Sequence, residues 1–153
     1  MEALVDLITN PFLMTGVAAW FLAQVIKTVL HAIINRKLDM TRLFGDGGMP
    51  SGHSATVTSM ATIIGLVYGF GSVAFAISGI LAIIVCHDAT GVRLETQKQG
   101  YLINELVNAF TELSGDKLPE VKLKAFVGHT PIQVLAGIIL GLITGFGAWL
   151  IWF

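Results

Sequence analysis

The sequence predicts an all-α integral membrane protein, a helical bundle of about four transmembrane spans plus an amphipathic interfacial helix. The first observation is composition, because only 12% of residues are charged while 54% are hydrophobic and the mean hydropathy is +0.78. A soluble domain usually carries about 25% charged residues, so this chain has too few to cover a surface in water. The second is length, since 153 residues fit a single domain over 1–153. The third is the series of apolar segments described next.

Four apolar segments cover about residues 12–34, 54–70, 73–86 and 132–153. A membrane span needs about 20 apolar residues, which the first and fourth segments supply. The second and third segments are shorter, and we expect each to extend into its polar flank. Only the four residues from Gly69 to Ser72 separate them, so the sequence predicts a tight helical hairpin there.

Two polar stretches remain, at residues 35–52 and about 87–130. Within the second stretch, apolar residues recur at the spacing of one helix face; they are Leu102, Ile103, Leu106, Val107, Phe110 and Leu113. We expect an amphipathic helix that lies at the membrane interface or caps the bundle. A solvated linker helix is the alternative.

All nine basic residues lie in or beside the two polar stretches. With four spans, both stretches fall on one side of the membrane, whereas both termini and the turn at 69–72 fall on the other side, which has no Lys or Arg. The positive-inside rule places the basic side in the cytoplasm. The sequence therefore predicts a multi-pass protein of the cell membrane whose polar side faces the cytoplasm.

The last apolar segment carries glycines four residues apart, at Gly137, Gly141 and Gly145. Glycines at this spacing allow two helices to approach closely in lipid. Packing inside one chain and a homodimer through these glycines are both open at this point.

The four histidines, His31, His53, His87 and His129, lie at predicted cytoplasmic span ends or in the adjoining loops. The run Gly-Gly-Met-Pro-Ser-Gly-His-Ser at 47–54 directly precedes the second span. Glycine and serine at a helix start offer backbone N–H groups to an anion, and a histidine in the same turn can protonate a departing oxygen. A plain helix cap made by Ser51 or Ser54 is the alternative.

A metal site built from these histidines and Asp88 is conceivable. No histidine pair, however, has a ligand spacing such as His-x-x-x-His. We therefore expect neither a metal nor another cofactor.

Three motifs occur in order along the chain: GGMPSGHSA at 47–55, DATGVR at 88–93 and VGHTP at 127–131. Together they resemble the divergent, short branch of the type-2 phosphatidic acid phosphatase family, which also includes the vanadium haloperoxidases. Pro-Ser-Gly-His at 50–53 matches the central signature of that family, and residues 128–137 resemble the second half of its last signature. The resemblance covers nearly the whole chain.

The resemblance implies a role for each matching residue. His129 would attack phosphorus and form a phosphohistidine, and His53 would protonate the leaving alkoxide. Ser51 and the backbone of Gly52 would hold phosphate oxygens, together with Lys27 in the first span.

The chain departs from the family pattern at several basic and acidic positions. The Arg-Pro after the first lysine and the Ser-Arg before the second histidine are missing, so Arg93 and Lys124 become candidates for phosphate binding. The aspartate that orients the nucleophile falls at Gln133, whose amide can accept from an imidazole N–H but cannot stabilise its charge as a carboxylate does. Asp88 is the candidate to replace that aspartate in space.

The predicted function is a lipid-phosphate phosphatase that acts on phosphatidate, phosphatidylglycerophosphate or an isoprenoid phosphate. Its expected partners are this lipid phosphate and the membrane lipids, and no nucleic acid. One rival is a non-catalytic binder or transporter of anionic lipids that uses the same basic cavity. Another is a structural partner in a larger complex.

Overall fold

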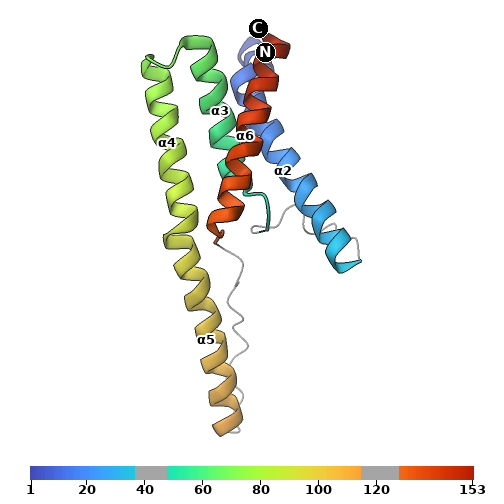
Figure 1. Ribbon diagram of the computed structural model, residues 1–153, viewed down its shortest axis with the longest axis vertical. Helices are drawn as coiled ribbons and strands as arrows, with labels where there is room; N and C mark the ends of the chain where they lie inside the picture. The colour runs from blue at the N-terminus through green and yellow to red at the C-terminus, as the bar shows by residue number, and fades with distance from the viewer. Residues whose placement is uncertain (37–47, 115–127) are drawn as a thin grey trace.

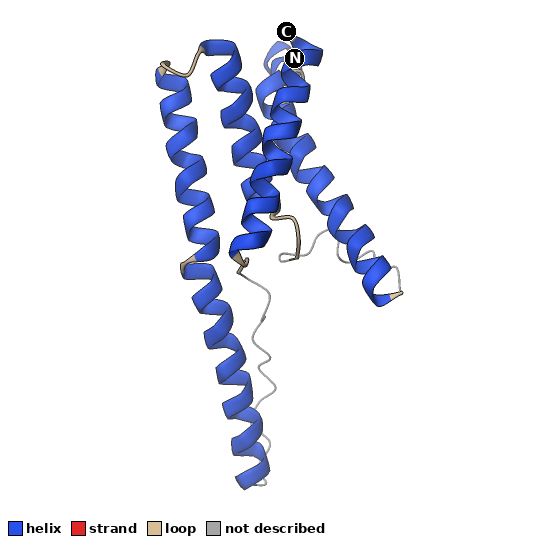
Figure 2. Cartoon of the chain, viewed as in Figure 1, coloured by secondary structure: helices blue, strands red, loops and turns tan. Residues whose placement is uncertain are grey.

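A computed structural model describes residues 1–36, 48–114 and 128–153, and the regular structure in these ranges is entirely helical (Figures 1 and 2). The helices are α1 (Glu2–Ile8), α2 (Pro11–Asn35), α3 (Gly52–Tyr68), α4 (Val73–Thr90), α5 (Val92–Ser114) and α6 (Pro131–Trp152). The all-α prediction is confirmed. The four predicted apolar segments correspond to α2, α3, α4 and α6, whereas the short α1 was not expected.

The outer surface of the bundle suits lipid. Helices α2, α4 and α6 are long and apolar enough to cross a membrane. Large apolar side chains on α4, such as Ile77, Ile80 and Ile83, are exposed, which would be unfavourable in water but is expected of a surface that faces acyl chains. The 17-residue α3 packs against α2, α4 and α6 and so occupies the centre of the bundle.

The turn between α3 and α4 is the predicted hairpin. Gly69 ends α3 at φ +85°, a conformation that glycine adopts without a steric penalty. The hydroxyl of Ser72 then caps α4 by accepting the backbone N–H of Phe75 at 3.2 Å. This turn and both chain termini lie at one end of the bundle (Figure 1). The described residues that border the two polar stretches lie toward the other end, as predicted.

The glycines of α6 pack against α3 inside the chain. A Cβ atom would lie 2.5 Å from the Ser51 carbonyl oxygen if added to Gly137, and 2.7 Å from the Ala55 carbonyl oxygen if added to Gly141. The same contact repeats one turn further along, between Gly145 and the Ser59 carbonyl. Both helices advance by four residues per contact in the same direction, so they run parallel and begin at the same end of the bundle. A homodimer through these glycines would have to displace α3.

Replacing Gly141 with valine is expected to lower the thermal unfolding temperature of the detergent-solubilised protein by about 5 °C or more. Its Cβ would lie 2.7 Å from both the Ala55 carbonyl oxygen and the Thr58 Cβ, so the two helices would have to separate. Gly147→Val is the matched control, because a Cβ there meets no atom within 4 Å. Equal unfolding temperatures for the two variants would contradict this packing.

Helix α5 continues the line of α4 beyond the bundle (Figure 1). The backbone hydrogen bonding runs through the junction, since the Gly91 N–H donates to the His87 carbonyl at 2.9 Å. The predicted helix is therefore confirmed, but among the helices it contacts only α4 and does not cap the bundle. Its apolar residues Leu102, Leu106 and Phe110 are exposed, and its placement at the membrane interface stays a prediction.

Candidate active site

A backbone hydrogen bond links the starts of α3 and α6, and it brings together the motifs at 47–55 and 127–131. The Ser51 N–H donates to the Gln133 carbonyl at 2.9 Å. The parallel glycine packing of α6 on α3 fixes this register, because Gly137 fits against the Ser51 backbone. The Pro-Ser-Gly-His turn therefore lies against the start of the helix that follows His129.

The motif at 88–93 is linked to the other two motifs through the backbone of residues 128 and 129. The His129 N–H donates to the Ala89 carbonyl at 3.1 Å, and the Gly128 N–H donates to the Gln97 side-chain oxygen at 3.1 Å. A Cβ on Gly128 would lie 2.4 Å from the Leu94 Cα, so this close approach to the α4–α5 junction requires glycine. Three motifs that are far apart in the sequence thus meet at one end of the bundle.

A pocket of about 210 Å³ opens where the motifs meet, and we call it the polar pocket. Its lining combines four of the predicted site residues with an apolar wall from α4; the lining residues are His53, Ile84, Val85, Asp88, Ala89, Arg93 and His129. Both predicted catalytic histidines therefore face the same cavity. The apolar wall was missed in the sequence, although Ile84 and Val85 precede Asp88 by one turn and so share its helix face.

His129 is held in a defined orientation at the start of α6. Its side chain is 4% exposed, and its ring Nδ1 lies 3.3 Å from the Gln133 Oε1. That oxygen also accepts the Thr130 N–H at 3.0 Å, which identifies the atom as the amide oxygen because an amide nitrogen cannot accept. Nδ1 must therefore be the donor, and a neutral His129 carries its lone pair on Nε2.

Gln133 thus performs several tasks with one side chain and one carbonyl. Its side chain completes the capping box of α6 with Thr130 and contacts the His129 ring. Its carbonyl receives the Ser51 N–H from α3. The predicted contact between Gln133 and the second histidine is present.

His53 lies in the first turn of α3, and its side chain is exposed. It lines the polar pocket and also an adjoining apolar groove. An exposed imidazole can exchange protons with water, as a general acid must between turnovers. The position of His53 is therefore compatible with proton donation into the polar pocket.

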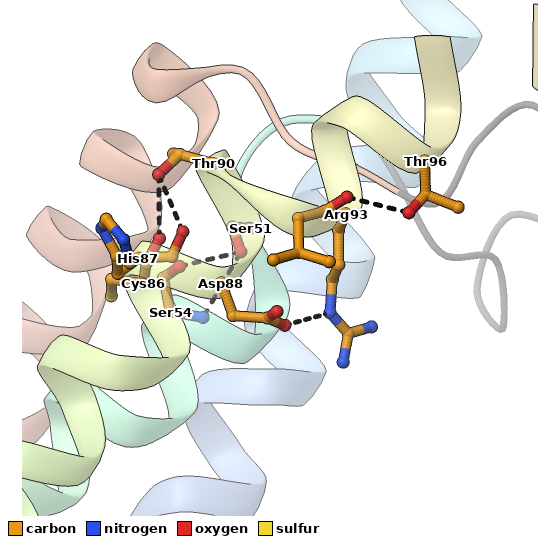
Figure 3. A network of polar contacts seen from close by, with 9 residues as sticks. Ser51, Ser54, Cys86, His87, Asp88, Thr90, Arg93 and Thr96 are labelled. Atoms are coloured by element: carbon orange, nitrogen blue, oxygen red, sulfur yellow. Dashed lines mark hydrogen bonds and ion pairs between the residues drawn. The ribbon is translucent and has the colours of Figure 1, made fainter. Parts of the chain in front are cut away.

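Ser51 is fully buried and acts as the helix cap of α3. Its hydroxyl accepts the Ser54 N–H at 3.3 Å and the Ser54 hydroxyl at 2.9 Å (Figure 3). The plain-cap interpretation of the motif is thus realised in the structure. Binding of phosphate oxygens by Ser51 and by the Gly52 backbone stays a prediction, which for Gly52 draws on the free N–H groups of a first helical turn.

Lys27 reaches the same turn from α2. It is 7% exposed, and its Nζ lies 3.8 Å from the position of a Cβ on Gly52. Its methylene stem passes 3.8 Å from the corresponding position on Gly48. Lys27 is not among the residues that line the polar pocket, and its role in phosphate binding stays a prediction.

Asp88 and Arg93 form an ion pair across the junction of α4 and α5. The Arg93 Nε donates to the Asp88 Oδ2 at 2.5 Å (Figure 3). Asp88 therefore orients the guanidinium, and Gln133 contacts the His129 ring; a role of Asp88 in orienting His129 stays a prediction. A guanidinium has five donors, so the terminal nitrogens of Arg93 can bind a phosphate while Nε holds Asp88.

Lys124 and His87 are the other residues that the sequence singled out. Lys124 lies in 115–127, outside the described residues. His87 lines a separate, shallow pocket with Cys86 on another side of α4. Within the described ranges, no group of three or more His, Cys, Asp or Glu side chains is arranged to hold a metal ion.

Comparison with known proteins identifies the family. The family model described as the divergent PAP2 family, a divergent branch of the type-2 phosphatidic acid phosphatases, matches residues 8–144. The chain is also 40% identical over 147 residues to the uncharacterized membrane protein YuiD of Bacillus subtilis (strain 168), covering 90% of this chain and 93% of that protein. No solved structure matches the chain. This membrane protein therefore belongs to the divergent PAP2 family.

Proposed function

We propose that the protein is a membrane-embedded phosphatase that hydrolyses lipid phosphomonoesters through a phosphohistidine. The observation that carries the proposal is the shared pocket, in which His53, His129 and Arg93 line one cavity of about 210 Å³. Two imidazoles and a guanidinium around one cavity supply a nucleophile, a proton donor and an anion clamp. Membership of a phosphatase-related family supports the same reaction class.

The first step is attack on phosphorus by the Nε2 lone pair of neutral His129. The N–P bond forms as the bond from phosphorus to the lipid oxygen breaks. Protonated His53 gives its proton to that departing alkoxide, so the lipid alcohol leaves neutral. Gln133 keeps the attacking nitrogen unprotonated, because its amide oxygen accepts a hydrogen bond from the Nδ1–H of His129.

The second step is hydrolysis of the phosphohistidine. His53, now neutral, accepts a proton from a water molecule whose oxygen attacks phosphorus. The N–P bond breaks, inorganic phosphate forms, and both histidines return to their starting protonation states. One histidine thus serves as acid in the first step and as base in the second.

Positive charge around the pocket stabilises the phosphoryl oxygens in both transition states. The Arg93 guanidinium lines the pocket, and Lys27 lies behind the first turn of α3. The first-turn N–H groups of that helix add a partial positive charge. Fixed donors at the developing charge are commonly the largest contribution to catalysis of this kind.

The substrate in this proposal is a phosphomonoester with a lipid tail, such as phosphatidate, phosphatidylglycerophosphate or an isoprenoid phosphate. The tail can remain among the spans while the phosphate enters the basic end of the bundle. By the positive-inside rule, the proposal places this end at the cytoplasmic face of the cell membrane.

Phosphate release by the purified protein tests the proposal. The protein in detergent is supplied with each of the three lipid phosphates, and inorganic phosphate is measured over time. Turnover of at least one substrate is expected. Tight binding without release would instead favour an anionic-lipid binder. Gln133 is the reason to test for that outcome, because an amide stands where the family pattern has a carboxylate.

Replacing Arg93 with alanine is expected to lower kcat/KM for a lipid phosphate by about 10- to 100-fold, the loss of one charge-assisted contact. Arg93→Lys keeps the charge but not the bidentate geometry, so an intermediate loss is expected. Lys98→Ala is the control, since Lys98 pairs with Glu95 on the exposed surface of α5. Equal kinetics in Arg93→Ala and the control would exclude Arg93 from phosphate binding.

A further inference from the structure

An apolar groove begins at the catalytic end of the bundle and runs along α2 and α3. It has a volume of about 350 Å³ and is lined by side chains of α2, α3 and α4, among them Val17, Trp20, Val57 and Met60. Two of its lining residues, His53 and Val85, also line the polar pocket. The groove and the polar pocket are therefore neighbours that share one wall.

The direction of the groove follows from the register of α2 on α3. The position of a Cβ on Gly52 lies 3.4 Å from the Trp20 ring, and that of a Cβ on Gly16 lies 3.0 Å from the Met60 Cγ. The two helices are thus antiparallel, and the groove extends from His53 toward Met60. This is two helical turns, or about 10 Å at 1.5 Å per residue.

A second apolar groove provides a comparison within the same molecule. It has a volume of about 430 Å³ and lies near the opposite end of α3, where Phe70, Phe75 and Phe146 contribute to its wall. Among the described residues, it shares none of its lining with the polar pocket. Apolar lining alone therefore does not single out a groove, but contact with the polar pocket does.

We propose that the groove from His53 to Met60 holds one hydrocarbon chain of the phosphate-bearing ligand, with the phosphate in the polar pocket. This inference rests on the proposed function, and it adds where the tail lies. Because His53 stands between the two spaces, a ligand that fills both would place its phosphoester oxygen beside the proposed proton donor. The exposed Val17 lies on the wall of this groove, whereas the neighbouring Gly16 is packed against α3, since a Cβ there would lie 3.0 Å from the Met60 Cγ.

Alkyl phosphonates test the groove without requiring turnover, because the protein's proposed chemistry does not cleave a C–P bond. Ethyl and dodecyl phosphonate are titrated into the protein in phosphatidylcholine nanodiscs. Binding is read from Trp20 fluorescence in a background with Trp149→Phe and Trp152→Phe. Partition of the dodecyl chain into the bilayer is the same for every variant, so the ratio of the variant Kd to the background Kd isolates the groove.

Val17→Phe fills the groove from an exposed position. It is expected to raise the Kd of dodecyl phosphonate about tenfold, which corresponds to about 1.4 kcal/mol, and to leave that of ethyl phosphonate unchanged. The matched control is Gly79→Leu, which fills the second groove and should change neither Kd.

The groove assignment is overturned if Val17→Phe leaves the dodecyl Kd unchanged, or if Gly79→Leu raises it. Phosphate release measured in parallel separates the two proposals. Chain-dependent binding without release from any lipid phosphate would reject the enzyme and keep the groove. Release that is insensitive to chain length in all variants would keep the enzyme and reject the groove.

Discussion

Replacing His129 with alanine is expected to lower phosphate release from a lipid phosphomonoester by about a thousandfold or more. The reason is that this variant has no nucleophile and cannot form the covalent intermediate. His129 is nearly buried, its backbone is held by Ala89, and its ring is oriented by Gln133. The measurement is the initial rate of inorganic phosphate release at saturating substrate.

His87→Ala is the matched control for this variant. His87 lies on α4 next to Asp88, at the same end of the bundle, but lines a different, shallow pocket. Its loss removes an imidazole without touching the polar pocket, so the rate should stay close to that of the unmodified protein. A His129→Ala protein that keeps its rate, or a His87→Ala protein that loses it, would contradict the assignment of the nucleophile.

Replacing His53 with alanine is expected to have an effect that depends on the leaving group. For an alkyl ester such as phosphatidate, the departing alkoxide is strongly basic, and loss of the proton donor should slow release by about 10²- to 10⁴-fold. For p-nitrophenyl phosphate, the departing phenolate is a weak base that needs little protonation. The same variant should therefore lose far less activity toward the aryl ester.

The two histidine variants together separate the two roles. His129→Ala should lose activity toward both esters, because the nucleophile is needed whatever leaves. Parallel losses toward both esters in His53→Ala would show that His53 does not act as the acid. A thermal unfolding curve for each variant checks that the bundle is intact.

Gln133 gives the site a specific chemical character. Its amide oxygen fixes the tautomer of His129 by accepting from Nδ1. It cannot, however, stabilise the charge that develops on the imidazole as phosphorus is attacked. In the proposed mechanism, more of the charge stabilisation therefore depends on donors that contact the phosphoryl oxygens, above all Arg93.

The membrane fold could be predicted from sequence because its signals are local. Long apolar segments mark α2 and α6, and the four residues from Gly69 to Ser72 mark the hairpin. The spacing of Gly137, Gly141 and Gly145 indicated a close helix contact, but it could not name the partner helix. That choice depends on the surface of α3, where Ser51, Ala55 and Ser59 present small residues at the same interval.

The course of α5 could not be predicted in the same way. Its amphipathic pattern indicates a helix, but the pattern does not specify its direction. The backbone hydrogen bond across Gly91 continues α4 into α5, so α5 extends beyond the bundle instead of folding over it. The helix and its apolar face are the features that the sequence did predict, and in the structure that face is exposed.

The candidate site was predicted through its motifs, and the structure adds which residues contact one another. His53, His129, Asp88 and Arg93 do line one pocket. The pairing of Asp88 with Arg93 and of Gln133 with His129 is a tertiary outcome. Ser51 shows most clearly what the sequence alone cannot decide, because a helix cap and a phosphate ligand both call for a serine at this position.

Trapping of the phosphoenzyme tests the central claim most directly. The protein is mixed with a lipid phosphate labelled on phosphorus and quenched in alkali, which preserves phosphohistidine, and the peptides are mapped by mass spectrometry. The mechanism predicts phosphate on His129 within the first turnover and none in His129→Ala. Label on any other residue, or full turnover with an unlabelled His129, would contradict it.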